Sequence, residues 1–162
     1  MFVYYIKMPS AKEAAAVQQL LLVSVGLILF FGMLAYNSAN AEHKRKNPSA
    51  PDLSLMKFLN SGIDNPSMKA ILVGMSSGVV FGFIDNAGLF FGMDALDPYL
   101  PGGPLSKAGF GNTFSDALGS FLSVFIGNLI QNATGINNTP MWAESVGIIA
   151  GCLAGIYVPS VI

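Results

Sequence analysis

Two acidic residues stand inside otherwise apolar stretches and are the strongest candidates for chemistry. Asp85 is the one charged residue in residues 70–93, and Asp116 is the one charged residue in residues 110–130. An ionisable group inside a bilayer is costly and is typical of an ion or proton path. If the two carboxyl groups approached each other, repulsion and desolvation would allow the pair to carry a proton. One hypothesis is therefore a proton or cation site.

A structural interpretation of the same two acids stays open. Asp85 with Asn86 would close the second apolar stretch, and Asp116 would lie in the first turn of the third, where the helix dipole favours a carboxylate. Asp85 follows Gly82 by three residues and Asp116 precedes Gly119 by three, so both acids share a helix face with small residues. On either interpretation they face partner helices.

Other reactive groups are few. Cys152 is the only cysteine and His43 the only histidine, so neither an internal disulfide nor a Cys/His zinc cluster is expected. The sequence contains no HExxH, GxSxG or phosphate-loop pattern. We therefore expect no enzyme activity, no metal site and no cofactor. The net charge of -1 argues against nucleic-acid binding, which needs a basic excess.

The elements that position these residues follow from composition. Of 162 residues, 52% are apolar and 10% are charged, against about 25% charged in soluble domains. A chain of this length cannot hide so much apolar surface in its own core. We expect an all-α, multi-pass transmembrane helical bundle of about four helices, inserted in a membrane and contacting its lipids. The expected parts are residues 1–36 (N-terminal segment and first transmembrane helix), 37–69 (polar basic linker with a short interfacial helix) and 70–162 (glycine-rich bundle, with spans 70–93, 110–130 and 146–162).

The first span has an alternative interpretation as a signal peptide. Residues 38–41 are small and precede Glu42, as at a cleavage site that would remove residues 1–41. A long segment with both acidic and basic residues precedes the apolar core, which favours an uncleaved anchor.

The linker and its charges set the expected topology. Residues 37–52 are too polar to order themselves, and Asp52 is expected to cap a helix at Leu53–Leu59. Lys44, Arg45 and Lys46 would retain this side in the cytoplasm, or contact anionic lipid or a partner. Counting Lys and Arg on each side favours both termini on the non-cytoplasmic face, which would leave the sequons at Asn132 and Asn137 unmodified.

Small residues recur every four positions in the last three apolar stretches. Such ladders let helix backbones approach closely in lipid, where van der Waals contact holds helices together. The ladders predict helix packing through Gly74, Gly78, Gly82, Gly147, Gly151 and Gly155, and through Gly111, Ser115, Gly119, Ser123 and Gly127. A shift of 73 residues also aligns Gly62–Gly82 with Gly135–Gly155 at nine identical positions. The match predicts a parallel repeat of two helical hairpins.

Residues 82–98, which read GFIDNAGLFFGMDALDP, resemble small multi-pass membrane proteins of large double-stranded DNA viruses that infect algae. The resemblance implies a minor capsid component of the virion, placed in the membrane inside an icosahedral capsid and contacting capsid proteins. We therefore expect a structural protein that scaffolds or anchors a larger assembly of several subunits. The alternative is a small proton or cation channel or transporter that uses Asp85 and Asp116.

Overall fold

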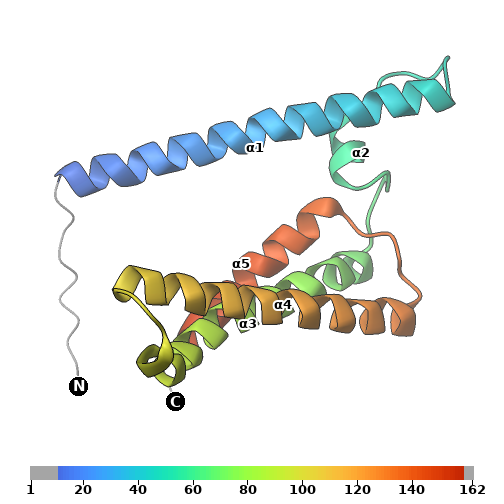
Figure 1. Ribbon diagram of the computed structural model, residues 1–162. Coiled ribbons are helices and arrows are strands. Elements are labelled where there is room, and N and C mark those ends of the chain that lie inside the picture. Colours follow the sequence, from blue (N-terminus) through green and yellow to red (C-terminus); the bar gives the residue numbers. More distant parts are fainter. Residues whose placement is uncertain (1–10, 159–162) are drawn as a thin grey trace. The chain divides into compact units, whose positions relative to one another are not determined.

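The computed structural model describes residues 11–158, whose regular elements are all helical. They are α1 (Ala11–Lys46), α2 (Leu55–Leu59), α3 (Met68–Leu96), the 3-10 helix η1 (Asp97–Tyr99), α4 (Pro104–Thr134) and α5 (Met141–Tyr157) (Figure 1). Residues 1–10 and 159–162, at the start of the expected N-terminal segment and the end of the last expected span, lie outside the described residues. The chain divides into two compact units, Met1–Leu55 and Met56–Ile162.

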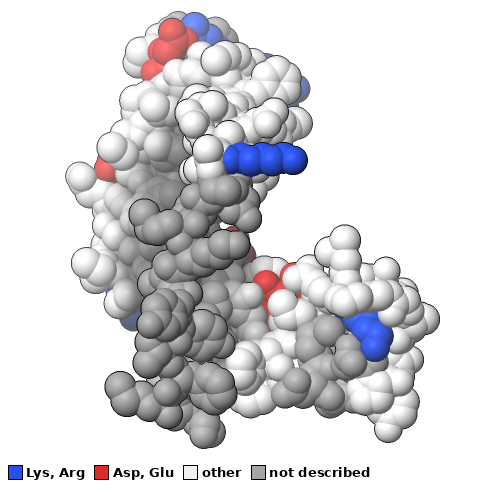
Figure 2. All heavy atoms as spheres, turned by 90° about the vertical axis from the view of Figure 1, so that its left-hand side faces the viewer, with Lys and Arg blue, Asp and Glu red and all other residues white. Residues whose placement is uncertain are grey.

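The long helices identify an integral membrane protein. By length and apolar composition α1, α3 and α4 can each cross a membrane, and α5 is a shorter apolar helix of 17 residues. Figure 2 shows one face of the molecule, on which Lys, Arg, Asp and Glu are sparse among uncharged residues. The expected all-α membrane bundle of about four helices is confirmed.

α1 is one continuous helix of 36 residues, so the expected solvated linker is wrong for residues 37–46. Ala, Glu, Lys and Arg dominate the end of this segment, and they are strong helix formers. Glu42 also pairs with Arg45 and Lys46, one turn further along the helix. The apolar part of α1 is entirely unburied within the protein. Its apolar side chains therefore need lipid around them.

The segment after α1 folds back along the last turns of that helix. The hydroxyl of Tyr36 donates a hydrogen bond to the Leu53 carbonyl oxygen at 2.6 Å, and the Leu53 amide donates to the Asn40 side chain at 2.8 Å. The expected short helix is present at Leu55–Leu59. Asp52 does not cap it as expected, because the Asp52 carboxylate instead accepts from Asn40 and pairs with Lys44.

In the second unit α3 is central and packs against both α4 and α5. α5 is inclined to α4, and these two helices separate toward the start of α5 (Figure 1). α4 begins at Pro104, six residues before the expected start at residue 110, because proline is well suited to the first helical position. It ends at Gly135, whose φ of 71° is left-handed.

The 73-residue match corresponds to equivalent structure in its two copies. Gly62 and Gly135 both have positive φ, at 83° and 71°, and the aligned methionines Met68 and Met141 begin α3 and α5. α3 and α5 run parallel, because Gly74 lies against Ala143 near their starts and Gly155 lies against Ala87 near their ends. The parallel direction of the two matched helices is therefore confirmed, and the repeat of two whole hairpins stays a prediction.

The connections at one end of this unit are tied together by hydrogen bonds. Trp142 Nε1 donates to Asn60 Oδ1 at 3.1 Å, and Asn138 Nδ2 donates to the Ser61 carbonyl oxygen at 3.5 Å. Residues 60–61 and 138–142 thus share one end of the unit, as the four-span topology requires. The side of the membrane on which they lie stays a prediction.

Candidate functional site

The first candidate region is the contact between α3 and α5, which we call the glycine interface. A β-carbon on Gly78 would overlap the Glu144 carbonyl oxygen, and one on Gly151 would overlap the Val79 carbonyl oxygen. Overlaps of the same kind with backbone atoms of the facing helix occur at Gly82, Gly147 and Gly155. Glycine is required at these positions because the two backbones are in direct contact.

Gly74 extends the glycine interface beyond the first residue of α5. A β-carbon on Gly74 would stand 2.9 Å from the Thr139 β-carbon and 3.0 Å from that of Ala143. Ala143 is fully buried. All six glycines expected to pack α3 and α5 therefore lie in one continuous contact.

The α3–α4 contact also uses the predicted ladder but is looser. All five ladder residues of α4, from Gly111 to Gly127, are buried. A β-carbon on Gly119 would stand 3.2 Å from the Phe81 carbonyl oxygen, and one on Gly127 would stand 3.2 Å from the Ser77 β-carbon. The α3–α4 contact can therefore accommodate an added β-carbon through small shifts of neighbouring atoms, whereas the glycine interface cannot.

The second candidate region is the aspartate pair, Asp85 of α3 and Asp116 of α4. Ser115, which is fully buried, donates its hydroxyl to Asp85 Oδ1 at 3.0 Å. Asn112 Nδ2 donates to Asp116 Oδ2 at 2.8 Å. The two carboxyl groups lie close enough to interact electrostatically. Two carboxylates at close range repel each other when both are ionised.

The structural interpretation of these acids as helix-end residues is wrong. α3 continues past Asp85 to Leu96, and α4 begins at Pro104, well before Asp116. Asn86, next to Asp85, does not close the helix but donates Nδ2 to the Cys152 carbonyl oxygen of α5 at 3.1 Å. The aspartate pair therefore lies within the bodies of two membrane helices.

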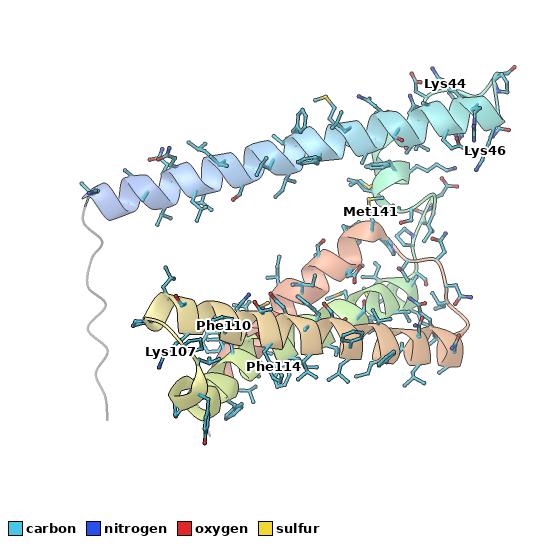
Figure 3. All side chains as sticks on the ribbon, in the orientation of Figure 1. Lys44, Lys46, Lys107, Phe110, Phe114 and Met141 are labelled. Atoms are coloured by element: carbon cyan, nitrogen blue, oxygen red, sulfur yellow. The ribbon has the colours of Figure 1, made fainter. Side chains whose placement is uncertain are left out.

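The third candidate region is the basic segment, Lys44, Arg45 and Lys46, at the end of α1 (Figure 3). Lys44 Nζ lies 2.6 Å from Asp52, and Glu42 pairs with Arg45 at 2.8 Å and with Lys46 at 3.4 Å. The hydrogen bond from Lys44, together with that from Asn40, lowers the pKa of Asp52. Two carboxylates therefore offset most of the positive charge, although exposed ion pairs are weak and exchange readily.

A fourth region was not expected from the sequence, namely a polar cavity between α4 and α5. Glu144 of α5 lines it and is the only charged residue of its lining. The last span expected from the sequence begins at residue 146 and so excludes Glu144, whereas α5 begins at Met141. The spacing signal was present, because Glu144 precedes Gly147 by three residues, as Asp116 precedes Gly119.

Metal ligands are not clustered in the part of the chain that the structure describes. Among residues 11–158 no three His, Cys, Asp or Glu side chains come together in a way that could hold a metal ion. Buried polar atoms of the side chains described are all hydrogen-bonded. These regions offer close helix packing, a pair of neighbouring carboxyl groups and a cavity lined by polar residues. No family model, curated protein or solved structure matches the chain.

Proposed function

We propose that this integral membrane protein has a structural role, scaffolding or anchoring a larger assembly of protein subunits. The observation that carries the proposal is the glycine interface, where backbone atoms of α3 and α5 are in direct contact. Packed cores of this kind resist continuous deformation. Such a helix pair is suited to holding a fixed position in a membrane rather than to opening and closing.

The contact surfaces proposed for partners lie outside the glycine interface. Large apolar side chains are exposed along α4, including Phe110 at 52% and Phe114 at 56% (Figure 3). The basic segment offers cationic groups that can exchange onto lipid phosphates or partner carboxylates. The resemblance of residues 82–98 extends the proposal to a virion inner membrane, with capsid proteins as the neighbouring subunits.

Crosslinking tests the scaffold proposal directly. Photo-crosslinking groups placed at Phe114 and at Lys46 are expected to capture defined protein neighbours in the native membrane fraction. The same group at Phe81, a half-buried aromatic residue of α3 that packs against Gly119 of α4, is the control and is expected to give only a crosslink within the chain. Absence of any protein neighbour at both exposed positions would contradict scaffolding. The membrane or particle in which the neighbours occur tests the virion proposal separately.

The second candidate function is a small proton or cation channel, and the aspartate pair favours it. Two neighbouring carboxyl groups, in helices long enough to cross a membrane, are the kind of site that a proton path uses. Purified protein in liposomes distinguishes the two functions by flux of protons or alkali ions. A scaffold is expected to give none, whereas flux that disappears in Asp85→Asn and persists in Asp64→Asn, a loop variant, would replace scaffolding by transport.

A further inference from the structure

The polar cavity between α4 and α5, which we call the Glu144 cavity, has the donor set of a cation site. It has a volume of about 250 Å³ and adjoins a second cavity of about 300 Å³, which shares Ser123, Val124 and Glu144. Residues that carry hydroxyl, amide or carboxylate groups line it from all three helices of the bundle and from the loop before α5. They are Ser77, Ser123, Asn128, Gln131, Thr139 and Glu144.

The carboxylate of Glu144 lacks a counter-charge within the described chain. Its hydrogen-bond partner is the Ser77 hydroxyl at 3.4 Å, a long and weak contact. The ion pairs found among the described residues all involve other acids. Glu144 stands in the first turn of α5, near the positive end of the helix dipole.

The Glu144 side chain is exposed beside the cavity. Its position along the membrane helices makes this lack of a counter-charge costly. The Glu144 backbone lies against Gly78, which is ten residues from the start of α3 at Met68. At the helical rise this corresponds to about 15 Å along a helix that is long enough to cross the bilayer. Ionised groups at such depth are normally paired. A ligand of opposite charge would satisfy the carboxylate.

The donor set also selects the class of cation. Calcium sites use six to eight oxygens, commonly with several carboxylates, and magnesium requires near-octahedral geometry with retained waters. One carboxylate among neutral oxygens instead suits a single positive charge. We propose that the Glu144 cavity binds a monovalent cation, either an alkali metal ion or the primary ammonium group of a lipid headgroup. Binding at this site requires neither transport nor the aspartate pair.

The experiment uses the full chain, purified in uncharged detergent. Trp142 is the only tryptophan and lies two residues before Glu144, so its emission reports on this end of α5. NaCl, KCl and NH₄Cl are titrated separately while choline chloride holds the ionic strength constant, because choline has no N–H group to donate. The second arm compares nanodiscs of phosphatidylcholine with nanodiscs that also contain phosphatidylethanolamine. Thermal stability is measured in both arms.

A saturable change in Trp142 emission and a raised melting temperature with Na⁺, K⁺ or NH₄⁺ identifies a free ion as the ligand. A change that requires phosphatidylethanolamine identifies the lipid ammonium group. In either case Glu144→Gln is expected to raise the half-saturating concentration at least about tenfold, because the charge-assisted contact is lost. Ser77→Ala, the second variant should Glu144→Gln fail to fold, is expected to give a smaller increase.

Asp64→Asn is the control, because it removes an acid from a loop outside the cavity lining and is expected to leave the response unchanged. The proposal is overturned if none of the cations or lipids gives a saturable response. It is equally overturned if Glu144→Gln or Ser77→Ala responds like the unmodified chain, or if the response is lost in Asp64→Asn alone.

Discussion

Substitution of Gly151 by alanine tests the glycine interface most directly. The new β-carbon would overlap the Val79 carbonyl oxygen and stand 2.9 Å from the Phe83 nitrogen. Ordinary contacts begin at 3.4 Å, so the Phe83 nitrogen alone requires α5 to move from α3 by 0.5 Å, and the nearer Val79 oxygen requires more. A gap of 0.5 to 1 Å forfeits about a quarter to a half of the dispersion attraction between the surfaces it separates. Overpacking of this kind typically costs about 1–3 kcal/mol.

Gly109→Ala in α4 is the matched control, because nothing lies within 4 Å of a β-carbon at that position. Alanine is the better helix former by about 0.8–1.0 kcal/mol, so this variant should be neutral or slightly more stable. Both variants replace glycine by alanine. Their surroundings alone explain why Gly151→Ala is expected to lower stability and Gly109→Ala to leave it equal or raise it.

The assay is unfolding by sodium dodecyl sulfate in mixed micelles, followed by the emission of Trp142. This indole donates to Asn60 of the same unit, and that contact breaks when the start of α5 leaves its place. We expect a lower unfolding midpoint for Gly151→Ala and an equal or higher one for Gly109→Ala. Equal midpoints for the two variants would refute direct backbone contact between α3 and α5.

Three further predictions concern separate features. Ser115→Ala removes the hydrogen bond to Asp85 and should lower the unfolding free energy in the same assay by about 0.5–1.5 kcal/mol. Gly135→Ala places a side chain at φ 71° with no clash, so it should cost about 1–2 kcal/mol from conformation alone, measured as a lower melting temperature. The pKa of Asp52 is lowered in the folded protein. The Asp52–Lys44 contact therefore stabilises the fold at pH values above 3.8, the ordinary aspartate pKa, and this stabilisation is lost as the pH falls through the lowered pKa. Lys44→Ala should return the Asp52 pKa toward that ordinary value in an NMR titration, and an unchanged pKa would contradict the pairing.

The sequence by itself determined which helices exist and which of their faces are small. Apolar length fixes the membrane helices, because each must satisfy its own backbone in lipid. The four-residue spacing of glycines fixes the contact faces, because residues four apart lie on one side of a helix. The repeat between residues 62–82 and 135–155 also predicted parallel helices, and all three features are present in the fold.

Helix ends followed less reliably from the sequence. Residues 37–46 read as a solvated linker because they are polar, yet local helix propensity and the ion pairs of Glu42 continue α1 through them. The same uncertainty placed Asp85 and Asp116 at helix ends and left Glu144 outside the last span. Polarity marks the end of a hydrophobic stretch, and a helix can continue beyond it.

Only the tertiary structure decided which polar groups meet. Asp85 and Asp116 are 31 positions apart in the sequence, and nothing local brings them close enough to interact. Their approach depends on the register of α4 against α3, which the buried Ser115 and Gly119 set through packing. The Glu144 cavity likewise exists because α5 is inclined to α4, and an angle between helices is a property of their contact rather than of either sequence alone.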